Sequence, residues 1–121
     1  MRKYLLHVLI ISFVFLLAPT AQVASYAGEI EDAREEVRNN PDDAEAHYNL
    51  GVTFGNSGKY QEAIEPLKQA TRLIPNYVDA QFMLGCVYVA IKDRDSALEQ
   101  YRILKRLNSE LANELLKVIN E

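Results

Sequence analysis

The sequence predicts an all-α protein built from stacked helical hairpins, and three observations lead to this fold class. A pattern of residues recurs after 34 positions without a gap, as in arrays of stacked supersecondary units. Within each period, apolar residues recur at spacings of three and four, which places them on one face of a helix. The composition, 49% hydrophobic and 25% charged, is typical of a folded chain. At 121 residues we expect one domain.

The N-terminal segment has the features of a secretory signal peptide. A basic start (RK) precedes the run YLLHVLIISFVFLLA, which has no formally charged residue, and a stretch of small and polar residues follows. These three parts in this order are typical of segments that are removed on export. We expect cleavage after Ala27, with Ala24 and Ser25 as close alternatives. Residues 1–27 are therefore predicted to be the signal peptide, and the protein to be exported to the periplasm or secreted.

An uncleaved membrane anchor is the alternative interpretation of this segment. A spanning helix needs about 20 apolar residues, and the run reaches that length only as residues 4–24. The chain would then be held in the inner membrane and face the periplasm. Cleavage would change the net charge from −4 to −6, because residues 1–27 contain two basic and no acidic residues. So acidic a chain is not expected to bind nucleic acid or an anionic lipid surface.

Two units of 34 residues, 44–77 and 78–111, follow each other in register. Small or apolar residues occupy most of the matched positions. The pairs are Leu50 and Leu84, Gly51 and Gly85, Phe54 and Tyr88, Ala63 and Ala97, Leu67 and Tyr101, Ala70 and Leu104, and Pro75 and Ser109. Each unit contains two helical patterns, and its glycine and alanine allow two helix backbones to approach closely. Each unit is therefore predicted to be a helical hairpin.

Single residues predict where the helices end and bend. Gly58 can adopt a positive φ and end the first helix of unit one. Asp93 or Asp95 can cap the second helix of unit two. Pro66 falls inside a predicted helix, and we expect it to bend that helix at the surface of the protein.

The repeated residues resemble the tetratricopeptide repeat (TPR), a 34-residue hairpin motif with Leu, Gly, an aromatic residue, Ala and Pro at set positions. His47 replaces the Trp of this motif, and the second unit departs from it at Gln81, Leu104 and Ser109. The resemblance implies a short right-handed superhelix. Two full repeats would be flanked by a half-repeat helix in residues 28–43 and by a capping helix in residues 112–121.

Residues that could perform chemistry are few. The chain has one cysteine, Cys86, which can form neither an internal disulfide nor a zinc cage. His47 is the histidine left after cleavage, and we interpret it as a packed or surface residue. We interpret Cys86 as a small apolar residue of the interior, with a redox role as the alternative. We therefore predict a protein that is not an enzyme, with no catalytic residue, metal site or cofactor.

The family resemblance implies protein binding. In TPR proteins the first helix of each repeat lines a concave groove that holds a peptide or a partner's helix. The residues at the matching positions are Tyr48, Asn49, Val52, Asn56, Phe82, Met83, Cys86, Val89 and Leu116. Tyr48 and Phe82 are the expected anchors. Some TPR proteins clamp a terminal carboxylate with basic residues, which are missing here, so we expect an apolar or mildly basic ligand segment.

The predicted function is that of an exported adaptor or scaffold. One alternative is a self-assembling TPR subunit whose groove is covered by its own copies, which would make a homo-oligomer. A second alternative is a membrane-anchored accessory subunit of an envelope assembly machine.

Overall fold

The computed structural model describes residues 24–121, and within this range the chain forms six helices and no strand. The first helix is described over residues 24–39 and is called the N-terminal helix below. The others are α2 (Ala44–Asn56), α3 (Tyr60–Leu73), α4 (Val78–Ala90), α5 (Arg94–Arg106) and α6 (Leu111–Asn120). The predicted all-α fold of two hairpins with a helix at each end is confirmed. The predicted leader lies outside the described residues except for residues 24–27.

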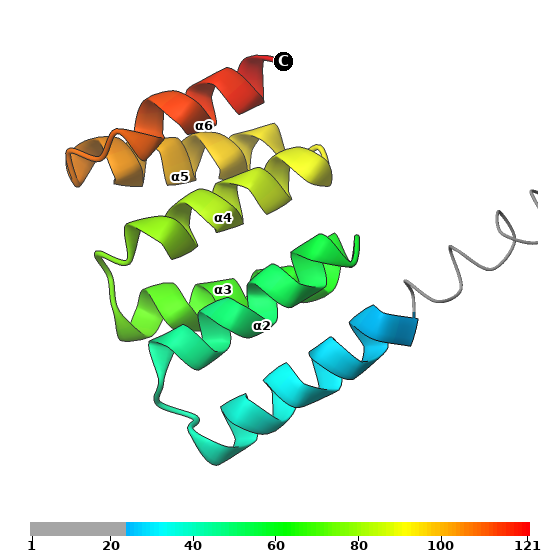
Figure 1. Ribbon diagram of the computed structural model, residues 1–121. Helices are drawn as coiled ribbons and strands as arrows, with labels where there is room; N and C mark the ends of the chain where they lie inside the picture. The colour runs from blue at the N-terminus through cyan, green and yellow to red at the C-terminus, as the bar shows by residue number, and fades with distance from the viewer. Residues whose placement is uncertain (1–23) are drawn as a thin grey trace, which may run out of the picture.

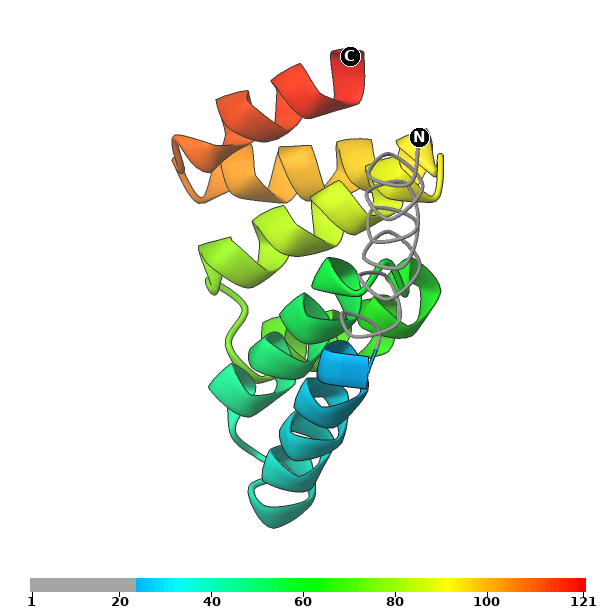
Figure 2. The same ribbon diagram turned by 45° about the vertical axis from the view of Figure 1, so that its right-hand side comes forward.

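The helices stack in chain order, from the N-terminal helix at one end to α6 at the other (Figure 1). α2 packs against α3 and α4 packs against α5, which gives the two hairpins. α3 contacts α4 and thereby joins the hairpins, and α6 contacts both α4 and α5. In Figure 2 the same layers are seen from another side, with the N-terminal helix below α2 and α6 above α5. α4 contacts both α2 and α6. The first helices of the two hairpins, α2 and α4, therefore lie on the same side of the stack as α6.

Buried side chains form two clusters. The first lies among the N-terminal helix, α2, α3 and α4, and the second lies between α5 and α6. The first cluster contains Ile30, Ala33, Leu50, Phe54, Ala63, Leu67, Leu84 and Val87, and the second contains Ala97, Leu104, Ala112, Leu115 and Ile119. Tyr88 of α4 packs against both. α4 is thus the element through which the two clusters meet.

The two matched glycines lie in tight contacts with different neighbours. A Cβ atom on Gly51 would lie 2.5 Å from Cγ of Leu67, in the other helix of the same hairpin. A Cβ atom on Gly85 would lie 2.5 Å from Cδ2 of Leu115, in α6. The close approach predicted for these glycines is present at both. In the second repeat, however, the three nearest atoms belong to the flanking helix and not to α5.

The turns inside the two hairpins share one backbone conformation. Gly58 and the matched Lys92 have positive φ angles of 79° and 64°. In each turn the next N–H, of Lys59 or Asp93, donates to a carbonyl five residues earlier at 2.9 Å. These bonds satisfy the last helical carbonyls in the manner of a Schellman motif. The role predicted for Gly58 is confirmed, and Lys92 adopts the same conformation without the freedom of glycine.

The sequence offered Asp93 or Asp95 as the cap of α5, and in the structure Asp93 is the capping residue. Its carboxylate accepts hydrogen bonds from the Ser96 N–H at 3.1 Å and from the Ser96 hydroxyl at 2.7 Å. These hydrogen bonds hold the pKa of Asp93 below its usual value of 3.8 because they stabilise the charged carboxylate.

The residues that replace the motif's Trp tie each repeat to the turn before it. The Nε2 atom of His47 lies 2.7 Å from the carbonyl oxygen of Pro41. One period later, Nε2 of Gln81 donates to the carbonyl oxygen of Pro75 at 3.3 Å. Both departures from the family pattern therefore make the same hydrogen bond. The interpretation of His47 as a structural residue agrees with this contact.

Pro66 lies inside α3 and is buried, so the expectation of a surface position is wrong. It belongs to the same buried face as Ala63, Leu67 and Ala70, and α3 continues beyond it to Leu73. The ring removes one N–H from the helical ladder. Burial of the ring against the neighbouring helices offsets part of that cost.

Candidate protein-binding face

The predicted groove residues lie on α2, α4 and α6, and we call this side of the stack the binding face. Eight of the nine are half-buried, and Asn56 is exposed. Beneath this face some of them pack against two different buried clusters. Tyr48 and Met83 pack against the first buried cluster, whereas Phe82, Cys86 and Val89 pack against the second. The two expected anchors, Tyr48 and Phe82, thus belong to different clusters.

A tyrosine that the sequence analysis did not select lies on the binding face. The rings of Tyr48 and Tyr77 have their centroids 5.1 Å apart and are tilted by 41°, a separation at which aromatic pairs attract each other. Tyr77 directly precedes α4 and is half-buried. In the 34-residue repeat, Tyr77 matches Asp43, which is a polar capping residue. The repeat pattern therefore did not predict the aromatic contact.

Nearby carboxylates influence the titration of this tyrosine pair. Burial raises the pKa of Tyr48, and the charge of Asp79 raises it further. The pKa of Tyr77 is raised first by burial, then by Tyr48 and by the carboxylates of Glu45, Asp79 and Asp43. Both hydroxyls therefore remain protonated and neutral around pH 7.

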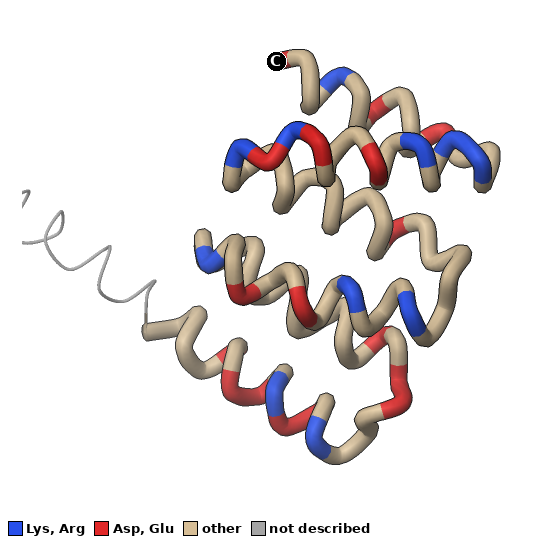
Figure 3. Tube along the Cα trace, turned by 180° about the vertical axis from the view of Figure 1, so that it is seen from behind, with Lys and Arg blue, Asp and Glu red and all other residues tan. Residues whose placement is uncertain are grey.

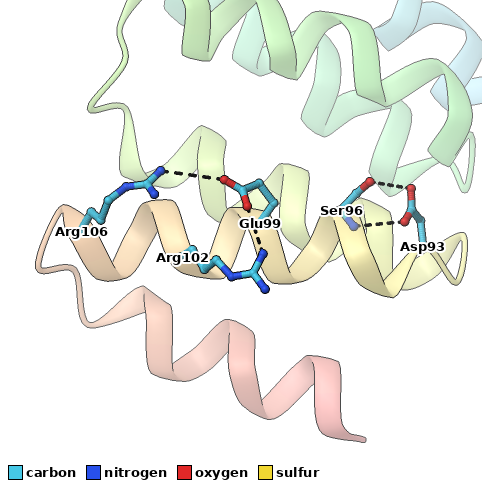
Figure 4. A network of polar contacts seen from close by, with 5 residues as sticks. All are labelled: Asp93, Ser96, Glu99, Arg102 and Arg106. Atoms are coloured by element: carbon cyan, nitrogen blue, oxygen red, sulfur yellow. Dashed lines mark hydrogen bonds and ion pairs between the residues drawn. The ribbon is translucent and has the colours of Figure 1, made fainter.

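Positive charge is distributed unevenly over the stack. α2 and α4 contain no Lys or Arg, whereas α3 and α5 contain several. Figure 3 shows the basic positions along α3 and α5 and an acidic but no basic position on α4. On α5, Glu99 pairs with Arg102 at 3.1 Å and with Arg106 at 3.9 Å (Figure 4). No ion pair among the described residues includes Asp43, Glu45 or Asp79.

Cys86 is half-buried against the second cluster. Burial raises the pKa of its thiol because the charged thiolate would lose hydration. A thiol with a raised pKa is a poor nucleophile at neutral pH. This environment favours the interpretation of Cys86 as a small apolar residue.

Within residues 24–121, no group of three or more His, Cys, Asp or Glu side chains is arranged to hold a metal ion. No helix in that range is both long and apolar enough to cross a membrane.

Val89 lines a shallow pocket of about 180 Å³ with Lys92, Arg94 and Ile119. Arg94 is engaged there, since it donates to the Ile119 carbonyl at 2.7 Å and holds the end of α6.

Comparison with known proteins agrees with this geometry. The tetratricopeptide repeat matches the chain twice, over residues 44–77 and over residues 79–117, which together are more than half of it. The chain belongs to the tetratricopeptide repeat family. Hsp70-Hsp90 organizing protein 1 from Glycine max is 29% identical over 68 residues, which are 56% of this TPR chain. The chain spans 12% of that relative's length. Two TPR units imply an adaptor for protein–protein interaction.

Proposed function

We propose that this TPR protein is a non-catalytic adaptor, exported from the cytoplasm, that binds a segment of a partner protein on the binding face. The observation that carries the proposal is the set of half-buried aromatic and aliphatic side chains on the first helix of each repeat. A side chain that is half-buried leaves apolar area for a partner to cover. An extended peptide or a helix that fits this face would gain from that burial.

Val52 and Leu73 make a matched pair of sites for testing the proposal. Val52 is half-buried on α2 and belongs to neither buried cluster of the described residues, so a charge there should not disrupt the core. Leu73 is 39% exposed at the end of α3, away from the binding face. Val52→Glu and Leu73→Glu add the same charge to an aliphatic position, and only the first lies where we expect the partner.

The test is a cross-linked capture of the tagged full-length chain from its native cells, with circular dichroism to verify that both variants fold. We expect a foreign protein that is enriched with the original chain and with Leu73→Glu, and lost with Val52→Glu. Equal capture by both variants would remove the binding face from the function. Recovery of only its own copies, sensitive to Val52→Glu, would instead identify the self-assembling subunit.

Export is supported by the order of basic, apolar and small residues at the N-terminus. The intact mass of the protein from its native cells tests this part separately. Loss of residues 1–27 is the expected result. A full-length mass in the membrane fraction would favour the anchored accessory subunit, which can use the same binding face.

A further inference from the structure

The chemistry of the binding face indicates what kind of segment it holds. We propose that the partner segment is basic, and that one of its Arg or Lys side chains packs on the Tyr48–Tyr77 pair while the neighbouring carboxylates neutralise its charge. This inference rests on the proposed function, because it specifies the ligand of the same face.

The tyrosine pair provides a surface suited to a cation. The rings contact each other at 5.1 Å between centroids, so a ligand would lie on their outer faces and not between them. Both rings are half-buried and hence partly open to a ligand. A cationic group within about 6 Å of a tyrosine ring centroid is attracted by the ring's negative face. The chain already contains such a contact, because Arg34 lies 5.4 Å from the Phe54 ring centroid.

Three carboxylates lie at the helix N-termini next to this tyrosine pair. Asp43 caps α2, Glu45 lies in the first turn of α2, and Asp79 lies in the first turn of α4. Glu45 lies one helical turn before Tyr48 on α2 and Asp79 lies two residues after Tyr77, so both are close to the ring pair in the fold. The charges of all three also raise the pKa of the Tyr77 hydroxyl. The helix dipoles of α2 and α4 reduce this negative charge, because each helix N-terminus contributes about half a positive charge. Three full negative charges exceed two half charges, so the region remains negative.

A purely apolar segment would fit this face less well. It would cover the carboxylates of Glu45 and Asp79 and supply no partner for them, and burying an unpaired charge is costly. Elsewhere in the described residues, three acidic side chains, Glu31, Glu99 and Glu114, form ion pairs with basic residues of the same chain. Since α2 and α4 have no basic residue of their own, the complementary charge would come from the ligand.

The test uses dye-labelled, capped peptides of one length and the full-length chain in a neutral detergent. In the probe, leucine alternates with arginine, and in two comparison peptides glutamine or glutamate replaces the arginine. Fluorescence anisotropy gives the affinity of each. We expect the arginine peptide to bind about tenfold more tightly than the glutamine peptide, from one cation–π contact and the paired carboxylates. We expect the glutamate peptide to bind most weakly.

Two variants with the same net charge locate the effect. Glu45→Gln/Asp79→Asn removes carboxylates beside the tyrosines, and Glu62→Gln/Asp95→Asn removes two from α3 and α5. The preference for arginine should be lost in the first variant and kept in the second. It should also fall about two- to fivefold in Tyr77→Leu and persist in Tyr77→Phe, which keeps a ring.

Three results would overturn the basic ligand. One is an equal loss of the preference in both charge variants, which would reflect net charge alone. The second is equal binding of the arginine and glutamine peptides, and the third is no binding of any peptide. The adaptor function itself would still stand if the cellular partner were captured by the original chain and lost with Val52→Glu. The capture experiment therefore tests the adaptor function, and the peptide experiment tests the basic ligand separately.

Discussion

The two repeats have matching sequences but complete their packing in different ways. In the first, the space over Gly51 is filled by Leu67 of the same hairpin. In the second, the space over Gly85 is filled by Leu115 of the flanking helix α6. The first hairpin therefore contains its own tight contact, whereas the second depends on a neighbour. The comparison teaches that matched residues of a repeat can keep their role while the helix that they contact changes.

The largest expected effect comes from removing the side chain that fills each space. Leu67 and Leu115 are fully buried, and replacing either by Ala should lower the free energy of unfolding by about 2–5 kcal/mol. Urea unfolding of the full-length chain measures this loss. The two variants should differ in location: Leu115→Ala should speed amide hydrogen exchange mainly in α4, α5 and α6, and Leu67→Ala mainly in α2 and α3. Identical exchange patterns would contradict the difference between the repeats.

The glycines themselves should give the next largest effect. At Gly51 an added Cβ would meet Cγ of Leu67, in the middle of that side chain, whereas at Gly85 its nearest neighbour would be a terminal methyl of Leu115. Gly51→Ala should therefore destabilise the protein by about 1–3 kcal/mol, and Gly85→Ala by less because a terminal methyl can move. Thermal unfolding provides the measurement.

Gly55→Ala is the matched control for the glycine variants. Gly55 also lies in α2, and nothing would lie within 4 Å of its added Cβ. Alanine there should raise the free energy of unfolding by up to about 1 kcal/mol through helix propensity. If Gly51→Ala raised the free energy of unfolding by the same amount, the tight contact with Leu67 would not affect stability.

A smaller effect is expected in the hairpin turns. Lys92 adopts a positive φ that glycine adopts at little cost. Lys92→Gly should therefore stabilise the second hairpin by up to about 1 kcal/mol, and Gly58→Ala should destabilise the first by a similar amount. Denaturant midpoints of the two variants test this pair. The turn account fails if both substitutions change stability in the same direction.

The smallest effect is a pH dependence from Asp93. Its pKa in the folded protein is lowered by the hydrogen bonds with Ser96, so its contribution to stability is present above the usual pKa of 3.8. That contribution is lost as the pH falls through the lower folded value, because protonation then becomes favourable in the folded state too. Asp93→Asn should make unfolding less dependent on pH below about 4, and Asp95→Asn, whose carboxylate does not cap α5, should not. A pH titration of the unfolding midpoint distinguishes them.

Much of the fold could be predicted because the 34-residue period in the sequence indicates the two helical hairpins and the positions of their helices. Gly51, Gly85, Gly58 and Asp93 have roles that their residue types favour, and the structure confirms these roles. Pro66 was wrongly placed at the surface because its local cost as a helix breaker says nothing about which face of α3 is buried. The helix that faces Gly85 could not be deduced either, since α6 lies outside the repeat.

The binding face was less predictable than the fold. The period places Tyr48 and Phe82 on matching helices, but it does not show that they pack against different clusters. Tyr77 lies at a capping position, where an aromatic contact has no sequence signature. Contacts between a helix and the turn of the next repeat depend on the geometry of the stack, which a linear pattern does not contain.

The central claim, that the binding face holds a foreign protein, is tested most directly by photo-cross-linking in the native cells. Asn56 on α2 and Lys68 on α3 are both exposed, so a photoreactive amino acid at either position should leave the fold intact. We expect an adduct with one other protein from position 56 and none of that protein from position 68. The same adduct from both positions, or adducts of the chain with only its own copies, would contradict the claim.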